Sequence, residues 1–154
     1  AVEQLFLDDG WDSNEIWNLV VGDVNEGGVD EYNGSSGQDI LMAGAVEASL
    51  YGGDGQDIMI GDNYGLNTTF ELGNREGVDK WDQVVDIIQG FGSGDELDLS
   101  NLGIEAVSGL TFVENNLYEA DGGIKIAEFS NFNDGLTLEQ LLTEDGAITY
   151  SSAV

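Results

Sequence analysis

The sequence contains no cysteine, no histidine and no proline, and only three of its 154 residues are basic. Without cysteine and histidine, the chain has no disulfide, no thiol nucleophile, no imidazole base and no usual zinc ligand set. Arg75, Lys80 and Lys125 stand against 31 acidic residues, which gives a formal net charge of −28. Nucleic acid is therefore not an expected partner, because its recognition depends on Lys and Arg at phosphates.

Long apolar runs are missing too, so no membrane insertion is expected. Residues 1–7 lack the basic segment and the long apolar run of a secretory signal peptide. The sequence starts at Ala1 rather than at Met, and we expect an excised fragment or a processed product.

Glycine, in contrast, is abundant, and much of it recurs at a spacing of nine. Residues 52–60 match the nonapeptide pattern G-G-x-G-x-D-x-U-x, in which U is a large apolar residue. Residues 34–42 match it closely, and residues 25–33 and 43–51 match it in part. A chain of hairpins rich in Gly and Asp would not place an apolar residue two positions after each Asp. All four segments keep the apolar eighth position, as Tyr32, Leu41, Leu50 and Met59, and the sixth position holds Asp30, Asp39, Ala48 and Asp57.

In this repeat, about six residues form a turn and about three form a short strand, so two nonapeptides complete one coil. Residues 18 positions apart should then stack, which places Asp39 beside Asp57 on one side of the coil. The other side has Asp30 beside Ala48, so one carboxylate is missing there.

Two stacked carboxylates and the carbonyl groups of glycine turns are the oxygen ligands that calcium prefers. Glycine lets these carbonyls converge, because the turn needs positive φ angles. The sequence therefore predicts a Ca²⁺ site between turns 34–39 and 52–57, and a site at Asp30 on the other side of the coil would need ligands from elsewhere. The candidate ligands are Asp39, Asp57, Gly34, Ser36, Gly37, Gly53 and Gly55, followed by Asp30, Gly28 and Asp62.

Residues 23–28 also approach an EF-hand loop, which is the alternative explanation of Gly28. Gly34 stands at the twelfth position of that loop, where a bidentate Glu or Asp is expected. The nonapeptide spacing explains both Gly28 and Asp30, and we prefer it.

The repeat resembles the RTX (repeats-in-toxin) family of bacterial proteins exported by type I secretion, over residues 25 to about 65. A second segment resembles the element that closes many RTX arrays and packs on the C-terminal end of the roll. It matches at Asp86, Phe91, Asp95, Leu97, Asp98, Leu99 and Ser100. The resemblance implies a calcium-binding parallel β-roll, the type I secretion machinery as a partner, and an extracellular or cell-surface location. The small number of repeats and the loss of one Asp are departures from the family pattern.

We therefore expect an all-β fold, with a short parallel β-roll, flanking capping strands and a short C-terminal helix. The expected divisions are N-terminal capping strands at 1–21, the roll at 22–65, an insertion loop at 66–80 and a C-terminal cap at 81–154. Within the cap, residues 110–114 and 124–129 should form a hairpin across residues 121–123. Thr137 and Gln140 form a capping box that should open the helix. Residues 148–154 suit a last edge strand, and they are also similar to an uncleaved type I secretion signal.

The expected function is a calcium-folded C-terminal module of a larger secreted protein, such as an adhesin, that supports type I secretion and extracellular folding. No enzyme activity is expected, because the sequence has no nucleophile elbow or phosphate loop, and 31 acidic residues produce carboxylate pairs by chance. The alternative is a non-catalytic module that binds an extracellular polysaccharide, with Trp11, Trp17 or Trp81 as its platform.

Overall fold

In the part of the chain that the structure describes, strands predominate and helix is scarce, which confirms the predicted all-β class. The computed structural model describes residues 16–21, 29–35, 37–44, 47–53, 55–61, 66–73, 85–120, 123–130, 137–144 and 146–150. Sheet A has the strand order β1 (Ile16–Val21), β3 (Gln38–Met42), β5 (Ile58–Ile60), β7 (Asp86–Gln89), β11 (Lys125–Ser130), β10 (Asn116–Glu119), β9 (Leu110–Val113). Sheet B has the order β12 (Ile148–Thr149), β8 (Glu96–Asp98), β6 (Thr68–Glu71), β4 (Glu47–Tyr51), β2 (Val29–Asn33).

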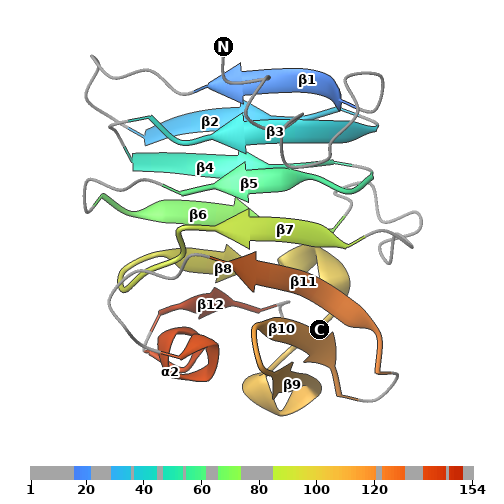
Figure 1. Ribbon diagram of the computed structural model, residues 1–154. Coiled ribbons are helices and arrows are strands. Elements are labelled where there is room, and N and C mark those ends of the chain that lie inside the picture. Colours follow the sequence, from blue (N-terminus) through green and yellow to red (C-terminus); the bar gives the residue numbers. More distant parts are fainter. Residues whose placement is uncertain are drawn as a thin grey trace.

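From β1 to β8 the chain alternates between the two sheets, strand by strand. Every strand in this part pairs in parallel with the next strand of its own sheet, one coil further on. Figure 1 shows the result, a stack of coils that runs from β1 and β2 down to β7 and β8. The predicted stacking of residues 18 apart is confirmed, because Ile40 pairs with Ile58 and Val29 pairs with Glu47.

The eighth position of each nonapeptide fills the space between the sheets. In sheet A the register aligns Leu41 with Met59 and Met59 with Ile88, and in sheet B it aligns Leu50 with Phe70. All five side chains are completely buried. Burying one such side chain contributes about 1.5–3 kcal/mol to stability, so these two columns are the main apolar support of the coil.

The parallel stacking continues beyond residue 65, where the sequence pattern led us to expect its end. Strands β6, β7 and β8 each add to the sheet in register with the strands before them. The nonapeptide spacing resumes in residues 63–71, 81–89 and 90–98, after insertions at 61–62 and 72–80. The two strands on either side of residues 92–94, β7 and β8, lie in different sheets as successive parts of a coil.

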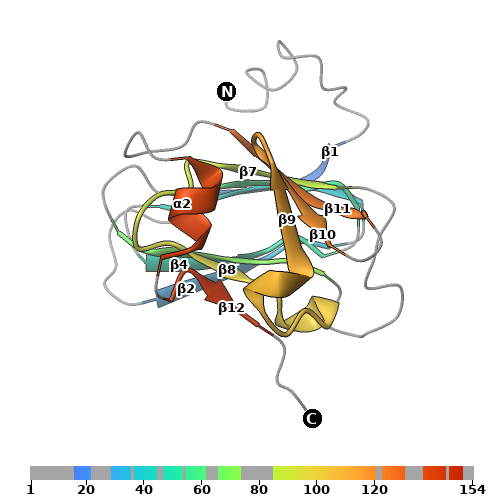
Figure 2. The ribbon, with the colours of Figure 1, turned by 90° about the horizontal axis from the view of Figure 1, so that it is seen from below.

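An antiparallel unit and a short helix close the C-terminal end. Strands β9, β10 and β11 form an antiparallel meander at the end of sheet A. The predicted pairing of 110–114 with 124–129 is wrong, because β10 lies between these strands and pairs with both. Helix α2 (Leu138–Leu142) has the predicted capping box. Seen from this end in Figure 2, α2 and β9 lie across the space between the two sheets.

Phe91 connects the two sheets through the core. It lies between Phe70 of β6 and Phe129 of β11, with ring centroids 5.7 Å apart in both pairs. The pair with Phe129 is edge-to-face, an arrangement that aromatic rings prefer. Two short 3-10 helices, η1 (Ser100–Leu102) and η2 (Val107–Gly109), then carry the chain from β8 to β9.

Candidate metal centre

The two turns predicted to hold calcium lie directly on each other. The N–H of Gly34 donates to the carbonyl oxygen of Tyr51 over 2.7 Å, so the first turn starts beside the residue before the second turn. The pairing of β3 with β5 keeps the ends of both turns in register. The sequence pattern thus predicted which two turns stack.

Glycine is required in these turns by both conformation and space. Gly37, Gly53 and Gly55 have φ angles of 118°, 96° and 108°, which L-residues rarely adopt. A Cβ on Gly53 would overlap the carbonyl oxygen of Ser35, and a Cβ on Gly55 would overlap that of Gly37. The backbone of one turn therefore packs directly against the carbonyl groups of the other.

Asp39 and Asp57 are neighbours in this stack, and both are completely buried. The N–H of Asp39 donates to Oδ1 of Asp57 over 2.9 Å. Oδ2 of Asp39 accepts hydrogen bonds from the N–H and the hydroxyl of Ser35, within its own turn. A Cβ on Gly52 would overlap Oδ2 of Asp57, so this carboxylate also folds back over the start of its own turn.

Asp86, one coil further on, accepts a hydrogen bond from Asp57 in the same way that Asp57 accepts one from Asp39. The N–H of Asp57 donates to Oδ1 of Asp86 over 3.0 Å, and the pairing of β5 with β7 places the two residues side by side. We call Asp39, Asp57 and Asp86 the carboxylate column. The sequence suggested Asp86, with Asp82, Asp95 and Asp98, either for an additional calcium site or for structural turns, and it did not predict that Asp86 stacks beside Asp57.

The donor set in this column suits calcium. Buried carboxylates need a cation or hydrogen bonds to offset the loss of hydration. The sole basic residue in the described part of the chain is Lys125, and its Nζ binds Glu128 on β11. Within the same part, no three His, Cys, Asp or Glu side chains form a metal-binding group by themselves. A calcium ion here would therefore need carbonyl oxygens of the glycine turns beside the carboxylates of Asp39 and Asp57.

The opposite side of the coil has a different column. The register aligns Asp30 with Ala48 and Ala48 with Thr68, as expected for the first pair. Oδ2 of Asp30 accepts the hydroxyl hydrogen of Tyr32 over 2.9 Å. Asp95 ends the column, where Oδ1 accepts the N–H of Thr68 over 2.8 Å and Oδ2 accepts the N–H of Gly92 over 2.9 Å. This side is held by direct hydrogen bonds around a single buried carboxylate.

Several predicted site residues lie outside the described part of the chain. Among the candidate ligands these are Gly28, Ser36 and Asp62. The same holds for the side chains of the proposed sugar platform, Trp11, Trp17 and Trp81.

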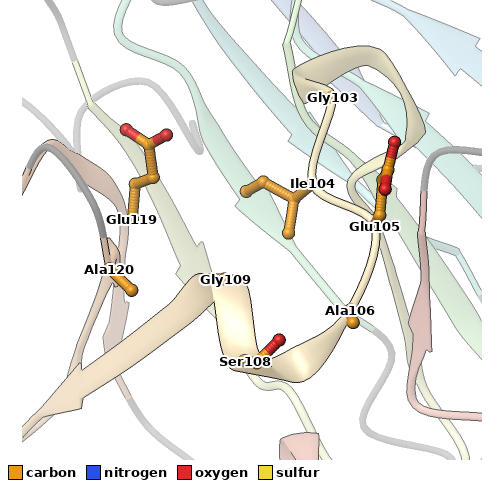
Figure 3. Close-up of a pocket in the computed structure, with 8 residues that line it drawn as sticks. All are labelled: Gly103, Ile104, Glu105, Ala106, Ser108, Gly109, Glu119 and Ala120. Atoms are coloured by element: carbon orange, nitrogen blue, oxygen red, sulfur yellow. The ribbon is translucent and has the colours of Figure 1, made fainter.

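A separate pocket lies at the other end of the molecule. It has a volume of about 370 Å³ and lies between the segment from η1 to η2 and the end of β10. Figure 3 shows Ile104 between the carboxylates of Glu105 and Glu119. Ser108 contributes the one side-chain hydroxyl of the lining, and none of the lining residues is basic. The full lining is Gly103, Ile104, Glu105, Ala106, Ser108, Gly109, Glu119 and Ala120.

No protein-family model, no curated protein and no solved structure matches this chain. In the part of the chain that the structure describes, no helix is long and apolar enough to cross a membrane.

Proposed function

We propose that this chain is a calcium-folded RTX-type β-roll module at the C-terminal end of a larger secreted bacterial protein. The observation that carries the proposal is the carboxylate column over stacked glycine turns, with Asp39 and Asp57 completely buried. Burial removes both carboxylates from water, and a cation beside them would offset that cost. Calcium supplies that charge and accepts carbonyl oxygens as further ligands.

The proposed mechanism couples calcium binding to folding. At low calcium concentration the net charge of −28 opposes compaction, so the chain stays extended. An extended polyanion can pass through a secretion channel. In the calcium-rich medium outside the cell, ion binding to the folded coil stabilises it by mass action. The C-terminal unit of β9–β11 and α2 covers the open end of the coil, as the end of any solenoid must be covered.

Circular dichroism with and without calcium tests the metal part of the proposal. We expect an unfolded spectrum in excess chelator and a strand spectrum after calcium is added in excess. Magnesium is the matched control, because it has the same charge but demands short octahedral coordination and loses water reluctantly. A full strand spectrum in excess chelator would overturn the proposal.

Export needs its own test. A reporter fused in front of residues 1–154 should appear in the medium of a host with a type I transporter, and a fusion that ends at residue 136 should not. A fusion that carries Asp57→Asn should be exported as well as the parent, yet remain unfolded and protease-sensitive outside. Retention of the parent fusion in the cell would exclude the secretion role and leave calcium-driven folding to stand alone.

A further inference from the structure

One side-chain oxygen at the end of a glycine turn has no hydrogen-bond donor. Oε1 of Gln38 is buried, and it accepts no hydrogen bond from any residue that the structure describes. Gln38 lies where the first glycine turn passes into β3, directly before Asp39. A buried polar oxygen normally accepts a hydrogen bond or contacts an ion, so this atom is a candidate ligand.

Gln56 is the equivalent residue one coil further on, and its side chain has a partner. Both glutamines occupy the fifth position of a nonapeptide, 18 residues apart. Nε2 of Gln56 donates to the carbonyl oxygen of Val85 over 3.0 Å, and Val85 is the fifth residue of the nonapeptide at 81–89. The side chain of Gln56 thus runs along the stack, from its own turn to the same position in the next coil.

The same course would bring the amide group of Gln38 to the interface between the two stacked glycine turns. The backbone on either side of Gln38 already lies in this interface. The carbonyl oxygen of Gly37 lies where a Cβ on Gly55 would be, and the N–H of Asp39 donates to Oδ1 of Asp57. Both carboxylates are completely buried. Buried charges need an opposite charge or a metal ion, so a cation suits this interface better than an uncharged donor.

We infer that Oε1 of Gln38 is a ligand of the calcium ion at the stacked turns. The inference rests on the proposed function, and it adds a side chain that the sequence pattern did not indicate as a ligand. Calcium takes about six to eight oxygens, and it accepts the amide oxygens of Asn and Gln as well as carboxylates and backbone carbonyls. Selectivity between calcium and magnesium depends on ligand number, so this additional oxygen favours the larger ion.

The substitution Gln38→Glu tests this role, because it replaces a neutral ligand oxygen by a charged one. We expect the calcium concentration at half folding to fall by about threefold or more, since calcium affinity rises with the charge of the ligands. Circular dichroism over a series of calcium concentrations measures this value. A half-folding concentration that stays unchanged or rises would overturn the inference, because a buried carboxylate away from a cation destabilises the fold.

Two control variants carry the same change in charge. Gln56→Glu places a carboxylate against the carbonyl oxygen of Val85, to which the native side chain donates, and it should raise the half-folding concentration. Asn33→Asp, at an exposed position of β2, should leave that concentration close to the parent value. An equal fall in Asn33→Asp would attribute the effect to net charge and overturn the inference. A parent chain that folds without calcium would refute the proposed function itself, whereas a calcium-dependent parent with an unresponsive Gln38→Glu would refute only the ligand role.

Terbium luminescence gives an independent measurement on a variant that keeps the amide group. Terbium(III) takes the same oxygen ligands as calcium, and its decay rates in ordinary and heavy water report the number of water molecules bound to the ion. In Gln38→Asn the shorter side chain withdraws the oxygen, so a water molecule should take its place and the number of bound waters should exceed that of the parent. An unchanged number would contradict the ligand role of Gln38.

Discussion

At the scale of single residues, each glycine turn combines a conformational and a steric requirement. Gly55 has a φ of 108°, and a Cβ there would overlap the carbonyl oxygen of Gly37. Gly146 has a φ of 81°, but a Cβ there would meet nothing within 4 Å. Substitutions at these two glycines therefore distinguish the loss of stability caused by a positive φ angle from the loss caused by steric overlap between stacked turns.

We predict that Gly55→Ala destabilises the protein much more than Gly146→Ala does. A positive φ alone costs about 1 kcal/mol for alanine, and this is the expected loss at Gly146. At Gly55 the overlap with Gly37 must also be relieved, so the expected loss is about 3 kcal/mol or more. Urea unfolding in saturating calcium measures both values. Equal losses would mean that the turns do not stack closely in solution.

Asp57 is the carboxylate whose charge matters most, because it lies between Asp39 and Asp86. Asp57→Asn keeps an oxygen that can accept the N–H of Asp39 but removes the charge. We expect calcium affinity to fall about tenfold or more, since affinity depends on the number of charged ligands. At a fixed calcium concentration this corresponds to about 1.4 kcal/mol less stabilisation.

The measurement is the urea midpoint over a series of calcium concentrations. Glu105→Gln is the control, because this exposed residue lies in the pocket near η2, remote from the glycine turns. An unchanged calcium dependence in Asp57→Asn would remove the carboxylate column from the metal site.

At the scale of elements, the two sides of the coil use carboxylates differently. Asp95 accepts the N–H groups of Thr68 and Gly92, and its column contains Ala48 and Thr68 where the other side has Asp39 and Asp57. Direct hydrogen bonds thus join the turns on this side around one buried carboxylate, whereas two completely buried carboxylates stack on the other side.

Asp95→Ala should therefore destabilise the fold without changing its response to calcium. Two buried N–H groups lose their acceptor, at a cost of about 1–3 kcal/mol each. The urea midpoint should fall at every calcium concentration, while its slope against the logarithm of calcium concentration stays that of the parent. A reduced slope would place an ion on this side as well.

The sequence was sufficient to predict the coil wherever the spacing of nine is unbroken. Leu41, Leu50 and Met59 lie in the core as the pattern required, and Asp39 lies beside Asp57. The continuation through β6, β7 and β8 was missed because two extra residues at 61–62 shift the spacing and the nine residues 72–80 do not match the pattern, although Phe70, Ile88 and Leu97 keep the apolar eighth position. An insertion in a turn changes the numbering of a solenoid but leaves the stacking of its strands intact.

The C-terminal unit was harder to predict for a different reason. The capping box at Thr137 and Gln140 is a local signal, and helix α2 begins where it predicts. Strand β10 was missed because the turn before it is formed by Glu114 and Asn115, with Glu114 at a positive φ of 54°, and only the glycine turn at residues 121–123 was taken into account. Pairing partners in a meander depend on which turn is used, and alternation of apolar residues does not specify it.

At the scale of the whole molecule, charge opposes folding and calcium can act in two ways. It can screen the net charge of −28 from a distance, or it can bind at the stacked turns. Simple screening does not depend on which salt is present, whereas a site of carboxylate and carbonyl oxygens does. Monovalent salt distinguishes the two mechanisms.

We predict that 1 M sodium chloride, at which the Debye length is about 3 Å, does not fold the calcium-free chain. Small-angle X-ray scattering should give a radius of gyration well above that of a compact domain in this salt, and a compact value after calcium is added in excess. For a chain of 154 residues the compact and unfolded values are about 15 Å and about 41 Å. Asp57→Asn at the same calcium concentration should remain more expanded than the parent, although its net charge is less negative. If sodium chloride alone compacts the parent to about 15 Å, calcium acts through charge screening, and the turns at Asp39 and Asp57 need no bound ion.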